Sequence, residues 1–246
     1  MIRAIKNNLI IILKRAYIKL RLYLLFSGNI FPQDLLKQFL NYKKFIKKKK
    51  ISNLKNIIDL GANSGNWSIL FKTIHKNSNF FLIEADSKHI DKIKKISNFF
   101  HIGLLDKSNG FKNFYVYEAF NGTGSSIFKE NSNHKYTIKR LKTSTLDKVL
   151  NKKFSKKSYD LLKLDTQGSE LDILKGATST LRKTRYIITE MQIQNYNFKS
   201  PNYSELNNFL KKKGFKKVKK LYSHIVNGKI SQSDVMYVNK NFKKVI

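Results

Sequence analysis

The chain contains no cysteine, and among its 246 residues only two are prolines and one is a tryptophan. The absence of cysteine excludes disulfide bonds and thiolate metal sites, and it fits a reducing compartment such as the cytoplasm. Acidic residues are also scarce, since 16 Asp and Glu stand against 49 Lys and Arg, which gives a net charge of +33. The remaining composition is that of a globular protein with 41% hydrophobic residues, in a chain long enough for one domain with a sizeable core.

The basic excess has two explanations. A charge of this size attracts polyanions such as nucleic acid, anionic lipid or an acidic glycan. Lys, Asn and Ile dominate together, however, and they share A/T-rich codons, so the base composition of the gene also accounts for an excess of Lys. Only residues 43–50 and 211–220 form dense basic clusters. We therefore expect a solvated basic surface, with nucleic-acid binding as the alternative.

Long apolar runs are also absent from the N-terminal segment, residues 1–29. Charged side chains interrupt its apolar residues, so that no run reaches the ~20 residues needed to span a bilayer, and no small-residue cleavage site follows. Apolar residues at helical spacing predict a basic amphipathic helix there. It either docks on the rest of the protein or makes a peripheral membrane contact through residues 1–26. A second helix is predicted at 32–48, so residues 1–50 form a helical extension of a domain at 51–246.

From residue 56 onward, apolar β-rich runs alternate with helical patterns, which predicts an α/β fold with a doubly wound parallel sheet. The last two strands, 215–222 and 233–239, have only a short turn between them, so one strand runs antiparallel to the rest. Residues 106–158 interrupt the alternation and are expected to be an insertion that shapes the substrate site. The expected strands are 56–60, 79–84, 99–105, 159–165, 185–191, 215–222 and 233–239, and the expected helices are 65–76, 87–98, 169–183 and 203–213.

The stretch DLGANSG, residues 59–65, joins the first strand to a helix. Gly61 permits a tight turn, and Gly65 lets the helix approach the strand closely. The spacing lacks the middle glycine that makes room for a pyrophosphate in dinucleotide folds. Asp59 at the strand end also disfavours a phosphate and suits a cationic amine or sulfonium. This loop therefore predicts a ligand other than a dinucleotide.

Acids end three further strands. Glu84 is placed to accept both ribose hydroxyls of an adenosine ligand, because Asp86 and Ser87 already supply the cap of the following helix. Asp165 ends the strand at 159–165 and is expected to face the loop in the same crevice. Glu190 ends the next strand and is a weaker candidate. Lys163 either points outward or pairs with an acid near the substrate.

The motifs DLGANSG, IEAD, TLDKVL, LLKLDTQGSELDILKGA, IITEMQ and SDVMYVN occur in this order from about Asn56 to Asn239. Together they resemble the FkbM-type S-adenosylmethionine-dependent methyltransferases. The resemblance implies the class I methyltransferase fold, which is a Rossmann-like seven-stranded sheet with the last strand antiparallel and helices on both faces. Members transfer a methyl group, typically to a hydroxyl of a sugar, glycan or polyketide product.

The resemblance also implies site residues. Asp59, Gly61, Asn63 and Gly65 hold the methionine part of S-adenosylmethionine, Glu84 holds its ribose, and Asp106 lies near adenine. Asp165 and Glu190 are the catalytic, substrate-side acids. One departure is Gln167, where many members carry Glu; if that acid were the base, this chain would lack it.

The sequence thus predicts an S-adenosylmethionine-dependent O-methyltransferase that acts on a hydroxyl of a sugar, glycan or related small acceptor. The alternative is a nucleic-acid-binding or RNA-methylating protein on the same scaffold. Acids that line the crevice would repel phosphates, which disfavours nucleic acid. The loop 121–127 is expected to close over the acceptor. No metal is expected, because the five His are scattered without ligand spacing.

Overall fold

The computed structural model describes residues 31–52, 54–118, 122–194 and 197–242. Residues 1–36 form one compact unit and residues 37–246 another. The helix predicted at 32–48 is confirmed as α2 (Gln33–Lys48). The amphipathic helix predicted within residues 1–29, and with it the membrane contact of residues 1–26, lies outside the described residues. The division of the chain at residue 50 stays a prediction.

A seven-stranded sheet forms the centre of the larger unit, with the strand order β3-β2-β1-β7-β8-β10-β9. Strand β10 is antiparallel to β8 and to β9, whereas β1, β2, β3, β7 and β8 pair in parallel. The predicted doubly wound sheet with one reversed strand is therefore confirmed, and it is the class I methyltransferase arrangement. The strands are β1 (Asn56–Leu60), β2 (Asn79–Glu84), β3 (Phe99–Ile102), β7 (Tyr159–Leu164), β8 (Thr184–Gln192), β9 (Phe215–Val226) and β10 (Lys229–Asn239).

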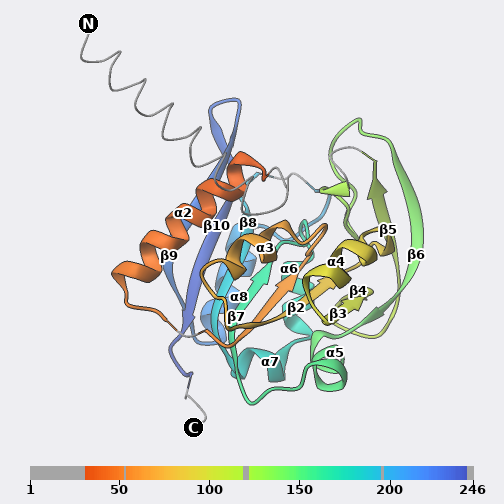
Figure 1. Cartoon of the computed structure of the whole chain (residues 1–246). Helices are drawn as coiled ribbons and strands as arrows, with labels where there is room; N and C mark the ends of the chain where they lie inside the picture. The colour runs from red at the N-terminus through yellow and green to blue at the C-terminus, as the bar shows by residue number, and fades with distance from the viewer. Residues whose placement is uncertain (1–30, 53, 119–121, 195–196, 243–246) are drawn as a thin grey trace, which may run out of the picture. The chain divides into compact units, whose positions relative to one another are not determined.

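Helices cover both faces of this sheet. Figure 1 shows α2, α3 and α4 on the near face and α8 behind it. Alternate strand residues supply the two cores, since successive side chains of a strand point to opposite faces. Ile58 and Leu162 belong to the core that includes residues of α5 to α8. The helices are α3 (Asn66–Lys72), α4 (Ile90–Ile96, after a 3₁₀ turn at Ser87–His89), α5 (Leu146–Lys153), α6 (Glu170–Lys175), α7 (Thr178–Arg182) and α8 (Tyr203–Lys212).

Two predicted elements are divided in the structure. The apolar run 99–105 breaks at Gly103, because β4 (Leu104–Leu105) leaves the main sheet and pairs with β6 (Tyr136–Ser144). With β5 (Gly110–Tyr117), these strands form a separate three-stranded sheet, of which β5 and β6 lie inside the predicted insertion and β4 lies just before it. The helix predicted at 169–183 divides at Gly176, where a Cβ atom would lie 2.6 Å from the Asp106 carbonyl oxygen.

The hairpin of β9 and β10 is longer than predicted. Its strands are joined by only Asn227 and Gly228, which have φ angles of 49° and 74°. Positive φ at both central positions is the geometry of the two-residue hairpin turn that Asn-Gly favours. The predicted strand ends at 222 and 233 were therefore wrong by several residues.

From Lys37 onward, α2 packs on α3. The Trp67 Nε1–H donates to Gln38 Oε1 at 3.1 Å, and the Tyr42 hydroxyl lies 2.9 Å from His75 Nε2. Burial lowers the pKa of His75 to about 4, so the imidazole is neutral at physiological pH. None of the described helices has the length and apolar character needed to cross a lipid bilayer.

Candidate active site

A cavity opens at the carboxyl ends of β1, β2 and β7, the edge of the sheet where open α/β folds bind their ligands. About 570 Å³ of space not filled by atoms lies between its lining residues, and part of this space is open to solvent. Four predicted site residues line it, namely Gly61, Asn63, Glu84 and Asp165. From the predicted acceptor loop 121–127, residues 122, 123 and 125 also reach the cavity, whereas residue 121 lies outside the described residues.

The glycine loop is shaped by the protein's own packing. Gly61 has φ +71°, and a Cβ atom on it would lie 1.8 Å from the backbone oxygen of Asp165. Gly65 has φ +79°, and its Cβ would lie 2.1 Å from the Ile96 side chain. Both positions therefore require glycine for backbone conformation and for space. The consequence at Gly61 is that the ends of β1 and β7 meet closely beneath the cavity.

Glu84 is the acid at the end of β2, and two backbone amides hold its carboxylate. The Asn63 N–H donates to Oε2 at 2.7 Å, and the Asp86 N–H donates to Oε1 at 2.8 Å. Burial raises the pKa of Glu84, and the backbone hydrogen bonds counteract that rise. Each carboxylate oxygen has a second lone pair, so the group retains acceptor capacity toward the cavity. Asp86 caps the following 3₁₀ turn by accepting from the Lys88 N–H, which confirms its predicted role.

Apolar side chains form another part of the cavity wall, and the sequence did not predict them. This apolar wall is built by residues that follow β2, by β4, by β5 and by α6: Ala85, Leu104, Leu105, Phe114 and Ile173. Leu104 and Phe114 also pack together in the small core of the three-stranded sheet. A flat apolar group fits beside such a wall better than a charged one does.

A buried lysine connects two of the predicted acids. Lys163 lies opposite Asp59 in the register of β1 and β7, and its Nζ is 3.3 Å from Asp59 Oδ1 and 3.3 Å from Asp165 Oδ2. The side chain of Lys163 is 6% exposed. Burial lowers the pKa of Lys163, but Asp165 and Asp59 outweigh burial, so the pKa is raised and the ammonium stays charged. Of the two roles predicted for Lys163, pairing with acids is the one that the structure shows.

The turn after β7 carries a polar network toward β8. Gln167, at φ +53°, donates from Nε2 to Asp165 Oδ1 at 2.9 Å and to Glu190 Oε1 at 3.3 Å. Gln232 on β10 also donates to Glu190 Oε1, at 3.0 Å. Burial and then the charge of Asp165 raise the pKa of Glu190 well above its usual range. Glu190 contacts the cavity-lining Gln167 and is itself not among the lining residues of the described chain.

The sequence match to a protein family is extensive. The methyltransferase FkbM domain matches residues 59–217, which is more than half of the chain.

The chain belongs to the FkbM methyltransferase family.

No match was found among curated proteins. Three solved structures illustrate the structural similarities of this FkbM methyltransferase. Methyltransferase FkbM from Methylobacillus flagellatus has a TM-score of 0.48 and 14% identity, over 76% of this chain and 44% of its own. TrmK from M. capricolum, solved with S-adenosyl-homocysteine, has a TM-score of 0.49 and 11% identity, over 89% and 73%. An S-adenosylmethionine-dependent methyltransferase from Clostridium acetobutylicum has a TM-score of 0.49 and 9% identity, over 92% and 98%. The present chain spans under half the length of the M. flagellatus protein.

A methyltransferase domain of this family uses S-adenosylmethionine as its methyl donor. The cavity fits such a group, because its lining combines a carboxylate with acceptor capacity and a set of apolar side chains. In the described ranges of the FkbM methyltransferase, no three His, Cys, Asp or Glu side chains gather as potential metal ligands. Independence of a metal stays a prediction.

Three of the predicted cofactor residues lie outside the cavity wall of the FkbM methyltransferase. Asp59 is fully buried, and its carboxylate contacts Lys163 and accepts from Ser68 Oγ at 2.7 Å. Gly65 packs against a side chain of α4. Asp106 is buried in an ion pair with Lys112 at 2.8 Å. The structure thus offers these three residues as supports of the site rather than as ligand contacts.

Proposed function

We propose that this FkbM methyltransferase transfers a methyl group from S-adenosylmethionine to a hydroxyl of a sugar, glycan or related small acceptor in the cytoplasm, without a metal. The observation that carries the proposal is the position of Asp165. Asp165 lines the cavity at the end of β7, close to the Gly61 turn, and its carboxylate is held by Lys163 and Gln167. An oriented carboxylate at that point suits an acceptor that must lose a proton.

On the cofactor side, Glu84 would accept hydrogen bonds from the ribose hydroxyls, because its two oxygens are already fixed by backbone amides. The apolar wall of Leu104 and Phe114 would hold the adenine ring. Gly61 and Asn63 would contact the methionine part. Asp59 and Gly65 would act indirectly, by fixing Lys163 and the start of α3.

On the acceptor side, Asp165 would accept the hydrogen bond of the acceptor hydroxyl and take its proton as the carbon–oxygen bond forms. Lys163 and Gln167 hold the carboxylate, so the acceptor oxygen is oriented rather than merely bound. When bound, S-adenosylmethionine supplies an electrophilic methyl group on a sulfonium. Glu190, which also accepts from Gln167 Nε2, would help to hold this amide in position to donate to Asp165.

Labelled methyl transfer into the glycan, lipid and RNA fractions of a cell extract tests the acceptor class. We expect label in a glycan-containing fraction. We expect Asp165→Asn to lower turnover about 100-fold, the usual contribution of a positioned base, with intact cofactor binding. Glu84→Gln should instead weaken S-adenosylmethionine binding about tenfold in a calorimetric titration, because a charge-assisted hydrogen bond is lost.

Asp91→Asn is the matched control, since Asp91 is an exposed carboxylate on α4 outside the cavity. It should leave turnover and cofactor affinity unchanged. Near-normal turnover of Asp165→Asn with intact cofactor binding would remove Asp165 from its role. Label confined to RNA would instead establish the nucleic-acid alternative.

A further inference from the structure

The tip of the β9–β10 hairpin projects beyond its neighbouring strand. Pairing of β10 with β8 ends at Gln232↔Gln192, whereas pairing with β9 continues to Lys229↔Val226. Because β10 is antiparallel to both neighbours, β9 runs in the direction of β8 and ends at the same edge of the sheet. The tip therefore rises from the edge that carries the catalytic cavity, as can be followed in Figure 1.

Large apolar side chains occupy this tip, where solvent-facing hairpins usually carry polar residues. Ile225, Val226 and Ile230 are all exposed, and Ile225 reaches 61%. Ile225 and Ile230 are direct cross-strand partners, so their side chains share one face of the hairpin. The tip thus presents Ile225 and Ile230 together on one face, with exposed Val226 next to them in the chain.

Two further exposed apolar residues extend the surface toward the cavity. Ile193 follows β8, and its N–H donates to the Ser231 oxygen at 2.8 Å, beside the hairpin tip. Phe198 is 63% exposed, and the preceding Asn197 donates to the oxygen of Gln167, which lines the cavity. Five of the nine large hydrophobic side chains that are exposed in the described part of the chain therefore gather at the catalytic edge.

The two segments that carry these residues contain Lys side chains but no Asp or Glu. They are residues 193–200, with Lys199, and residues 222–231, with Lys229, in a chain of net charge +33. Apolar side chains flanked by ammonium groups match the boundary between the headgroups and acyl chains of an anionic bilayer. Nucleic acid would pair with the lysines but would gain little from the exposed Ile and Val side chains.

We propose that Ile193, Phe198, Ile225, Val226 and Ile230, with Lys199 and Lys229, form a docking rim that binds an anionic membrane surface and turns the cavity toward it. The rim is distinct from residues 1–26. The proposal does not depend on which hydroxyl is methylated, because lipid binding and methyl transfer are measured separately.

Co-sedimentation of the full chain with vesicles tests the docking rim. The vesicles contain phosphatidylcholine alone or with about a quarter phosphatidylglycerol. We expect binding to the anionic vesicles only. The double variant Ile225→Ser/Ile230→Ser should lower that binding about tenfold, because apolar area is lost from the interface. Lys229→Glu should weaken binding to the anionic vesicles as well.

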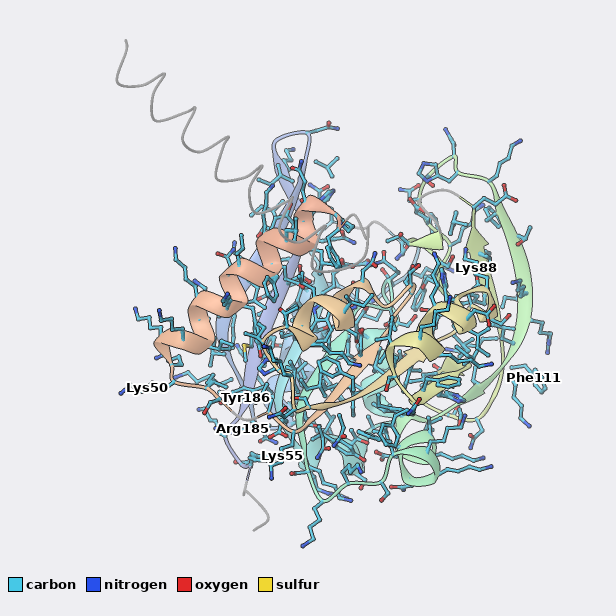
Figure 2. All side chains as sticks on the ribbon, in the orientation of Figure 1. Lys50, Lys55, Lys88, Phe111, Arg185 and Tyr186 are labelled. Carbon is cyan, nitrogen blue, oxygen red and sulfur yellow. The ribbon has the colours of Figure 1, made fainter. Side chains whose placement is uncertain are left out.

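The matched control is Phe111→Ser/Ile138→Ser, which removes apolar side chains of 61% and 55% exposure from the three-stranded sheet. Phe111 projects from that side of the molecule in Figure 2. The control should bind vesicles as the wild type does, and all variants should keep the wild-type circular dichroism and cofactor affinity. No binding by the wild type, equal binding by the tip variant, or equal loss in the control would overturn the proposal. So would a wild-type dimer that the tip variant converts to a monomer without any vesicle binding.

Discussion

Replacing Lys163 by Met would remove the buried cation between two acids while keeping an unbranched side chain that is one atom shorter. At an effective dielectric constant of about 20, an ion pair at 3.3 Å is worth about 5 kcal/mol before desolvation. The contact with Asp165 counts for less, because that carboxylate is 37% exposed. Asp59 is fully buried and would remain as an uncompensated charge. We therefore expect Lys163→Met to lower the free energy of unfolding by about 3–5 kcal/mol.

Lys139→Met is the control, because Lys139 also lies 3.3 Å from a carboxylate, that of Asp86, but is 48% exposed. Because Lys139 is exposed and Asp86 keeps Lys88 at 3.4 Å, loss of Lys139 should cost about 0–1 kcal/mol, and the two variants should differ by several kcal/mol in spite of equal distances. Urea unfolding, followed by the fluorescence of the single tryptophan and by circular dichroism, measures both. The pKa of Lys163 is raised, so its contribution is complete below the unfolded value of 10.5 and the deficit should be constant near neutral pH. A loss below about 1 kcal/mol, or one equal to that of Lys139→Met, would refute the reasoning.

Three further predictions concern stability. Gly61→Ala should prevent folding or lower the free energy of unfolding several-fold more than Gly228→Ala does, as measured by urea unfolding of both variants. The new Cβ at position 61 would lie 1.8 Å from the Asp165 oxygen, whereas a Cβ at Gly228, which also has a positive φ of +74°, would have nothing within 4 Å. In the wild type, stability should fall by at most about 1.4 kcal/mol per pH unit as the pH falls from 6.5 toward 4, because burial keeps the native His75 imidazole neutral while the unfolded one takes up a proton. His75→Gln should make the free energy of unfolding less dependent on pH in this range. Glu190→Gln should raise the free energy of unfolding by about 1 kcal/mol at neutral pH and should leave it unchanged below pH 4.5. The reason is that the pKa of Glu190 is raised in the folded protein, so burying this side chain costs stability only at a pH above its unfolded pKa. A gain in stability that persists in acid would contradict this cause.

The strands of the main sheet were predictable because apolar runs end abruptly at polar residues. Strands at 56–60 and 79–84 agree with the prediction at both ends, since Asp59, Glu84 and the adjacent loops interrupt the apolar pattern. The region after Gly103 was not predictable in the same way. Leu104 and Leu105 continue an apolar run, yet they pair with β6, which lies more than 30 residues away. Local pattern does not encode such a partner.

The acids at the strand ends were predictable as residues of this edge, but the direction of each carboxylate was not. Asp59 is the last residue but one of β1 and Glu84 is the last of β2, yet Asp59 contacts buried Lys163 whereas Glu84 lines the cavity. The difference depends on where distant cations lie once the strands are in register. The ion pair that holds Asp106 depends likewise on Lys112 in β5. Apolar wall residues such as Phe114 carry no polar signal that would mark them as part of a site.

The ion pairs of Lys163 also affect the register in which β1 and β7 pair during folding. A slip of two residues between β1 and β7 would keep the same faces buried, because side chains alternate with period two. It would place Lys163 opposite Ile57 or Gly61 instead of Asp59. Asp59 would then be buried without its cation, whereas the apolar neighbours would hardly distinguish the two alignments. The charged pair therefore favours one register of β1 and β7 over alignments that would bury the same apolar faces.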